Sequence, residues 1–204
     1  MQGYILRVTK VRDEDCIVSI LTQNRLIDSY RFYGARHSSI LLGHKIDFEL
    51  EQNPNFLPRL RGVMHLGFAW LLDRQRELIW QDFIKLLYSH LKDVESLDEG
   101  YFIILEEATK KLFKQNPKRV MVESYVKLLE LEGRLHKKPI CFICDREIEG
   151  AIALARAYLP AHESCIDKKG LKRQDLLYLY ENKSSINLED EEIESLYLTM
   201  LQGL

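Results

Sequence analysis

The hydrophobic pattern of this chain changes period near residue 63, and that change constrains the fold more than any other feature. Within 45–51, apolar residues alternate with charged ones, as in a strand with one buried and one solvated face. Beyond residue 63, apolar residues recur at steps of three and four, which is the spacing of an amphipathic helix. The sequence therefore predicts an α+β protein with strands first and helices after them.

Five short β-like runs fill the N-terminal part of the chain. Residues that favour turns, such as those at 53–55, separate most of them. The runs cover 4–11, 16–22, 26–33, 45–51 and 57–63. Five strands of this length suit a closed barrel, so we predict an OB-fold-like barrel over residues 1–63, although a small sandwich or an SH3-like barrel would give nearly the same pattern.

Amphipathic segments follow the predicted barrel and are expected to form a helical bundle over residues 64–137. Asp98 is a good N-cap for one helix, and Asn116 followed by Pro117 suits the start of the next. Gly133 can end that helix in the left-handed conformation. Two shorter helices are expected within residues 171–204, and we predict that they pack on the bundle because neither is long enough to be stable alone.

A cluster of cysteine and histidine lies between these helical parts, within residues 138–170. Cys141 and Cys144 are separated by two residues, and so are His162 and Cys165. Two such pairs can direct four donors at one ion, and three thiolates with one imidazole suit tetrahedral Zn²⁺. We therefore predict a zinc-binding module. Because four protein donors fill the coordination shell, the zinc is expected to be structural.

Other interpretations of these cysteines exist. Cys141 and Cys144 could be small buried residues or a redox pair. A nucleobase deaminase also has a Cys-x-x-Cys pair, but it needs a His-x-Glu tripeptide upstream, and none precedes Cys141. The sequence shows no nucleotide-binding loop and no paired-acid motif, so we predict that the protein is not an enzyme.

Composition limits the partners that the chain can have. The net charge is −2, from 29 Lys and Arg against 31 Asp and Glu, so DNA contact would require a local basic surface. No apolar run approaches the roughly 20 residues that a membrane helix needs. The N-terminus shows no export signal, and the clustered cysteines suit a reducing compartment, so we expect a cytoplasmic protein.

Several stretches of the sequence resemble the RecO family of bacterial recombination mediators. They are Gly-Ala-Arg at 34–36 with nearby serines, Ser-Tyr-Val-Lys-Leu-Leu-Glu-Leu-Glu-Gly at 124–133, and Pro-Ile-Cys-Phe-Ile-Cys at 139–144. Their order agrees with the family along nearly the whole chain. Tyr33 stands where the family commonly has Lys, which weakens a DNA contact, and His162 stands where Cys is familiar, which keeps a zinc ligand.

The resemblance implies a DNA-binding recombination mediator in DNA repair. Such a protein binds single- and double-stranded DNA, anneals complementary single strands, and assists recombinase loading onto DNA coated by single-stranded-DNA-binding protein. It implies RecR, single-stranded-DNA-binding protein and, indirectly, the RecA recombinase as partners, and a nucleoid-associated location in the cytoplasm. The alternative is a zinc-stabilised adaptor that binds proteins only.

Basic residues are interleaved with aromatic ones in the predicted barrel and suggest how DNA would bind. Cations release counterions from phosphates, and exposed rings can stack bases. Strand alternation puts Arg31 and Tyr33 on one face and Tyr30 and Phe32 on the other. We assign the first pair to the surface and the second to the core. The predicted DNA-binding residues are Arg25, Arg31, Tyr33, Arg36, Arg59 and Arg61.

A second basic cluster lies near the turn between two predicted helices. It contains Lys110, Lys111 and Lys114. These lysines could bind DNA or an acidic partner, such as the tail of single-stranded-DNA-binding protein, and the simpler interpretation of each is a solvated helix end.

Overall fold

The computed structural model of the chain describes all residues except 13, 35–39 and 95. The chain forms two compact units, Met1–Thr109 and Lys110–Leu204. Strands dominate the first 65 residues and helices the remainder, so the predicted α+β fold class is confirmed. None of the described helices is both long and apolar enough to span a membrane.

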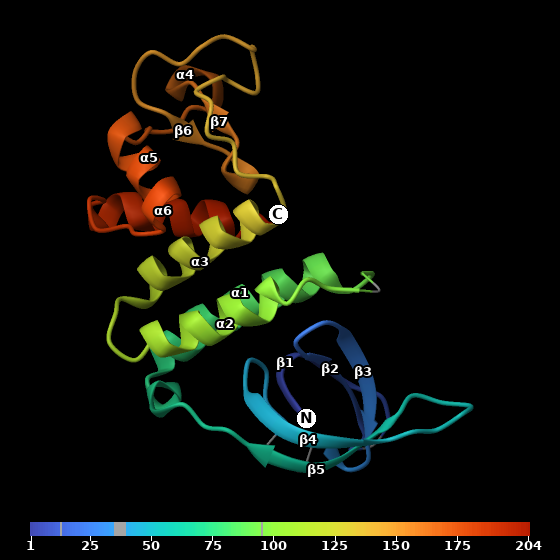
Figure 1. The fold of residues 1–204 in the computed structure, drawn as a ribbon. Coiled ribbons are helices and arrows are strands. Elements are labelled where there is room, and N and C mark those ends of the chain that lie inside the picture. The colour runs from blue at the N-terminus through green and yellow to red at the C-terminus, as the bar shows by residue number, and fades with distance from the viewer. Residues whose placement is uncertain (13, 35–39, 95) are drawn as a thin grey trace. The chain divides into compact units, whose positions relative to one another are not determined.

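Five strands form a closed barrel in the first unit (Figure 1). They are β1 (Gln2–Lys10), β2 (Cys16–Leu21), β3 (Leu26–Arg31), β4 (Lys45–Glu51) and β5 (Arg59–His65). The order around the barrel is β1-β2-β3-β5-β4, and all neighbouring pairs are antiparallel except β3 with β5. The barrel closes because β1 pairs with both β2 and β4. The predicted five-stranded barrel is therefore confirmed.

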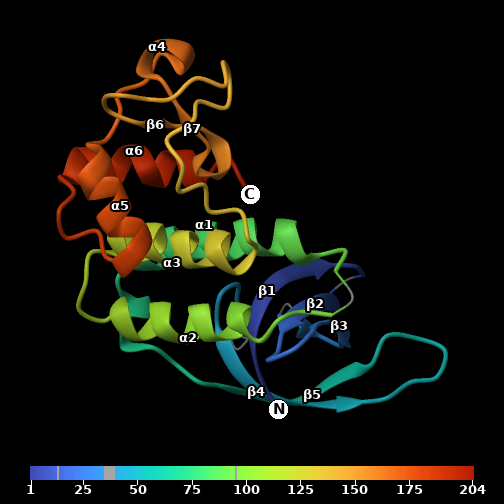
Figure 2. The same cartoon turned by 45° about the horizontal axis from the view of Figure 1, so that its top comes forward.

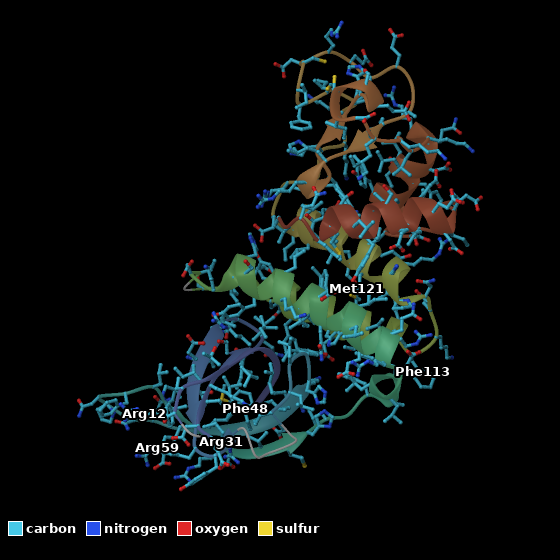
Figure 3. The ribbon with its side chains drawn as sticks, turned by 180° about the vertical axis from the view of Figure 1, so that it is seen from behind. Arg12, Arg31, Phe48, Arg59, Phe113 and Met121 are labelled. Atoms are coloured by element: carbon cyan, nitrogen blue, oxygen red, sulfur yellow. The ribbon has the colours of Figure 1, made fainter. Side chains whose placement is uncertain are left out.

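Apolar side chains from alternate strand positions fill the barrel. Val18 and Ile20 on β2 are fully buried, as are Ile46 and Phe48 on β4. Figure 3 shows Phe48 inside the barrel. On β1, the consecutive residues Tyr4, Ile5 and Leu6 are all buried, so this strand is covered on both faces.

Two helices pack on one side of the barrel within the first unit (Figures 1 and 2). They are α1 (Arg74–Leu91), preceded by the short η2 (Ala69–Leu72), and α2 (Gly100–Lys111), most of which belongs to this unit. The Tyr4 hydroxyl donates to Glu106 at 2.6 Å, and Trp80 Nε1 donates to the Gly43 carbonyl at 2.8 Å. Gly43 has φ +80°, and a Cβ there would lie 2.6 Å from Trp80 Nε1, so only glycine fits this contact.

The segment 64–137, predicted as one helical bundle, is divided between the two units. Helices α1 and most of α2 belong with the barrel, whereas α3 (Pro117–Leu131) belongs with the C-terminal half. Asn116 caps α3 as predicted, because its side chain accepts from the backbone N–H groups of Lys118 and Arg119. The four-part domain division drawn from the sequence stays a prediction.

The second unit combines α3 with a small Cys/His module and two C-terminal helices (Figure 2). Its further elements are β6 (Ala153–Leu154), η3 (Arg156–Tyr158), β7 (Pro160–Ala161), α4 (Glu163–Ile166), α5 (Arg173–Asn182) and α6 (Asp190–Met200). The buried Tyr158 holds η3 against both α3 and α6, because its ring lies 4.8 Å from that of Tyr125 and its hydroxyl donates to the Leu196 carbonyl at 3.0 Å.

Candidate nucleic-acid interface and metal centre

The four predicted metal ligands come together in the second unit. The donor atoms of Cys141, Cys144, His162 and Cys165 all lie within 4.8 Å of one another. His162 Nδ1 is 3.5 Å from the Cys144 sulfur and 3.8 Å from the Cys165 sulfur. The cluster can therefore hold one metal ion.

Two short backbone turns position these ligands. In the first, the Asp145 N–H donates to the Cys141 carbonyl at 2.9 Å, and Asp145 takes a left-handed φ of 56°. In the second, the Cys165 N–H donates to the His162 carbonyl at 3.0 Å as α4 begins. The Phe142 N–H donates to the Pro160 carbonyl at 2.9 Å, and this backbone hydrogen bond joins the two turns. The spacing of two residues within each pair is what allows these tight turns.

The surroundings lower the pKa of two ligands, Cys141 and Cys144. They raise the pKa of Cys165, chiefly through burial, and that of His162, chiefly through its hydrogen bond with Cys141. Burial opposes ionisation of Cys141, but N–H donors from His162, Cys144 and Ile143 outweigh it and lower its pKa to about 6. Arg146 lowers the pKa of Cys144, first through its backbone N–H and then through its guanidinium. His162 Nε2 contacts the Glu147 carbonyl at 3.1 Å, which leaves Nδ1 facing the sulfurs.

The donor set fits a tetrahedral ion of the size of zinc. Bond lengths of about 2.3 Å to sulfur and about 2.05 Å to nitrogen give a sulfur–nitrogen separation of about 3.6 Å in a tetrahedron. The two distances from His162 Nδ1 lie on either side of that value. Four protein donors leave no coordination position for a substrate, so the site is suited to holding structure.

A groove rich in aromatic and basic side chains lies at one end of the barrel. We call it the barrel groove; its volume is about 530 Å³. It lies between the β1–β2 turn, the end of β3, and the β4–β5 connection, which projects from the barrel in Figure 1. The side chains that define it are Arg12, Tyr30, Phe32, Phe56, Leu57 and Arg59.

Aromatic rings are presented to solvent in the barrel groove. The Phe56 side chain is 78% exposed and Phe32 is 44% exposed. Tyr30 packs edge-on against Phe32 with ring centroids 4.9 Å apart, and the Arg59 guanidinium lies over the Phe32 ring at 5.3 Å. Figure 3 shows Arg12 and Arg59 near each other at this end of the barrel. Such a surface can stack a planar base and contact its phosphate.

Asp15 fixes the backbone that presents Phe32. Its carboxylate accepts from the Tyr30 hydroxyl at 2.6 Å and from the Tyr33 N–H at 2.8 Å. Both hydrogen bonds lower the pKa of Asp15, and the bond from the Tyr30 hydroxyl has the larger effect. The carboxylate thus acts within the protein and does not line the groove. No Asp or Glu is among the described residues that line it.

The predicted DNA-binding residues do not form one surface. Arg59 lines the barrel groove, whereas Arg61 pairs with Glu51 at 3.0 Å and does not line it. Arg25 is exposed and lines a separate pocket with Met1 and Phe102. Tyr33 is 60% exposed. Arg36 lies outside the described residues.

Two of the four side-chain positions predicted at the end of β3, those of Arg31 and Phe32, are wrong, whereas Tyr33 is exposed as predicted. Phe32, expected in the core, is exposed, and Arg31, expected outside, is half-buried, with its guanidinium donating to the Leu60 carbonyl at 2.9 Å. The reason is that β3 ends at Arg31 and Tyr33 takes a left-handed φ of 53°, so strand alternation does not continue through residues 32 and 33.

Of the residues that define the barrel groove, only Arg59 was among the predicted DNA-binding residues. Arg12 lies two positions after β1 ends at Lys10, and it is one of the basic residues interleaved with aromatic ones in the predicted barrel. Phe56 follows the Asn53-Pro54-Asn55 turn, and an aromatic residue beside a strand normally suggests a core position. Exposure of Phe56 depends on the conformation of the β4–β5 connection, which the hydrophobic pattern does not encode.

The lysines of the second basic cluster have different surroundings. Lys111 binds the buried Glu123 at 2.7 Å, and Glu123 also accepts from the backbone and side chain of Ser185 at 3.0 Å each. Lys111 therefore stabilises the second unit internally. Lys110 and Lys114 are exposed. Partner binding by these three lysines stays a prediction.

Part of the chain matches a known protein family. Residues 1–71 match the family model described as RecO N terminal. The matched segment contains the whole barrel and about a third of the 204 residues. A search of curated proteins found no match. The family match supports the RecO family that the sequence predicted.

Proposed function

We propose that this chain, with its RecO-family barrel, is a recombination mediator of DNA repair that binds single-stranded DNA in the barrel groove. The family match supports the role in DNA repair and recombination. The observation that supports the binding site is the groove itself, where exposed rings and arginines meet without a lining carboxylate among the described residues.

Two kinds of contact would hold DNA there. Arg12 and Arg59 would release counterions from phosphates, and this contribution weakens as salt rises. The slope of log K against log salt concentration is about −0.7 per contact for single strands. Phe32 and Phe56 would each stack a base, at roughly 1–3 kcal/mol per base. Neither contact reads base edges, so binding would be tolerant of sequence. That property suits a protein that must hold any strand.

Annealing follows from the same contacts. Two complementary strands repel each other through their phosphates, and cations bound along one strand reduce this repulsion. Stacking on exposed rings keeps bases unpaired and extended until the second strand arrives. No covalent step is involved, so the proposed activity requires no catalytic residue. Assistance in recombinase loading, and contacts with RecR and single-stranded-DNA-binding protein, belong to the same proposal.

The metal centre would support this activity indirectly. We propose that it binds structural Zn²⁺ and stabilises the second unit, because binding free energy at such small sites contributes directly to folding. The proposed location is the cytoplasm, in association with the nucleoid.

The test is fluorescence anisotropy with labelled oligothymidylate across a salt series, together with an annealing assay on complementary oligonucleotides. The double variant Arg12→Gln/Arg59→Gln should weaken DNA binding and slow annealing. It should also reduce the slope of log K against log salt concentration by about 1.4, from two contacts at about 0.7 each. The matched control is Arg25→Gln/Arg61→Gln, which removes the same charge from the barrel outside the groove.

Three results would decide between the interpretations. Loss confined to the groove variant supports the proposal. Equal loss in both double variants would show that the DNA contacts are spread over the barrel and would reject the groove. Absence of DNA binding by the wild-type chain at low salt would favour the adaptor that binds proteins only.

A further inference from the structure

A second groove lies on the first unit, between β1 and α1. We call it the helix groove; its volume is about 570 Å³. Its floor is apolar, with Leu6 and Leu41 among the lining residues, and its basic residues are Arg7, Lys85 and Lys92. No carboxylate is among the described lining residues, although acidic residues outnumber basic ones in the whole chain. The groove is therefore suited to an anionic ligand.

Arg7 is held in place at the edge of this groove. Its guanidinium donates to the Tyr88 hydroxyl at 3.1 Å and lies 5.1 Å from the centre of the Tyr88 ring. No described carboxylate pairs with Arg7, so none of the described residues neutralises its charge. A guanidinium that is already ordered loses less side-chain entropy when it contacts a phosphate.

Strand β1 connects the helix groove to the barrel groove. The helix groove is lined by Leu6, Arg7 and Val8, and the barrel groove by Val11 and Arg12. Arg12 follows Arg7 by five positions, which span at most about 16 Å of extended chain. Lys10 is exposed between them. Basic residues thus occur in both grooves and on the strand that joins them.

We propose that the helix groove binds the continuation of the same DNA strand that occupies the barrel groove. This inference rests on the proposed function of the barrel groove. The strand would pass from the barrel groove over the outer face of β1, with phosphates near Arg7 and Lys92. Apolar side chains on the floor would contact the faces of bases, which require no specific hydrogen bonds. The chain would therefore bind a longer stretch than the barrel groove alone can accommodate.

The test compares two lengths of oligothymidylate, about 5 and about 15 nucleotides, which lie near the limits of the site sizes of single OB-folds. The variant is Arg7→Gln/Lys92→Gln. The matched control is Arg74→Gln/Arg173→Gln, which removes two exposed charges that line neither groove. Arg74 is at the opposite end of α1 from Lys92, about 27 Å away along the helix. Affinity, stoichiometry and salt dependence are measured by anisotropy.

The variant should bind the long oligonucleotide about three- to tenfold more weakly than the wild type, with a salt slope reduced by about 1.4. Its affinity for the short oligonucleotide and that of the control for both lengths should be unchanged. Equal weakening at both lengths, or no weakening at either while the wild type binds both, would overturn the inference and leave the barrel groove proposal standing. Two short oligonucleotides per chain, reduced to one by the variant, would indicate a second strand and also overturn it. If the wild type binds neither length, the proposed function itself fails.

Discussion

Replacing Phe56 with alanine should weaken single-stranded DNA binding without affecting the fold. The ring is 78% exposed, so its removal exposes little apolar core and should change the free energy of unfolding by no more than about 0.5 kcal/mol. Loss of one stacked base corresponds to roughly 1–3 kcal/mol of binding free energy, which is about a 5- to 150-fold higher Kd. Anisotropy with oligothymidylate measures the change in Kd, and thermal unfolding measures the change in stability.

The control for this prediction is Leu72→Ala, because Leu72 is 94% exposed in the same unit and does not line the barrel groove. Its Kd should equal that of the wild type. Phe56→Trp should retain binding, since a larger ring can still stack. The stacking role of this ring would be refuted if Phe56→Ala bound oligothymidylate as tightly as the wild type, or if Leu72→Ala lost as much affinity as Phe56→Ala.

Two further predictions concern stability. Cys141→Ser should reduce bound zinc from about one ion per chain to near zero and lower the unfolding temperature of the second unit, while the unfolding temperature of the barrel stays the same. Unchanged zinc content by elemental analysis would show that the ligand assignment is wrong. Burial of His44, with a smaller contribution from His65 whose ring centroid lies 4.3 Å away, lowers the pKa of His44 to about 4 from 6.5. As pH falls, the unfolded chain therefore binds a proton at His44 before the folded chain does. The contribution of neutral His44 to the free energy of unfolding should be fully present at pH 7 and decrease by up to about 3 kcal/mol between pH 6.5 and 4. The variant His44→Gln should lose that part of the pH dependence in denaturant titrations, and a dependence equal to that of the wild type would contradict the assignment.

The parts of the fold that depend on local pattern were predictable from the sequence. Alternation at 45–51 predicted β4 with the bounds that the structure shows, and Asn116 with Pro117 predicted the start of α3. The metal ligands were predictable for the same reason, because each pair is held by a turn of only a few residues. Local spacing was enough to orient the donors within each pair, whereas the backbone hydrogen bond from Phe142 to Pro160 brings the two pairs together.

Features that depend on contacts between distant residues were not predictable. The packing of α2 on the barrel depends on Glu106, which binds both Tyr4 and Lys45 at 2.6 Å, and no periodic signal connects these positions. The barrel groove depends on Asp15, whose bonds to Tyr30 and Tyr33 end the alternation of β3 and leave Phe32 exposed. Hydrophobicity suggested the opposite position for that ring.

Ultraviolet cross-linking of the full chain to oligothymidylate tests whether single-stranded DNA lies in the barrel groove. Mass spectrometry of the digested complex identifies the residues that carry the adduct. We predict adducts on Phe32 or Phe56, which are reduced when salt is raised. Adducts confined to residues 110–204, with none on the barrel, would contradict the account.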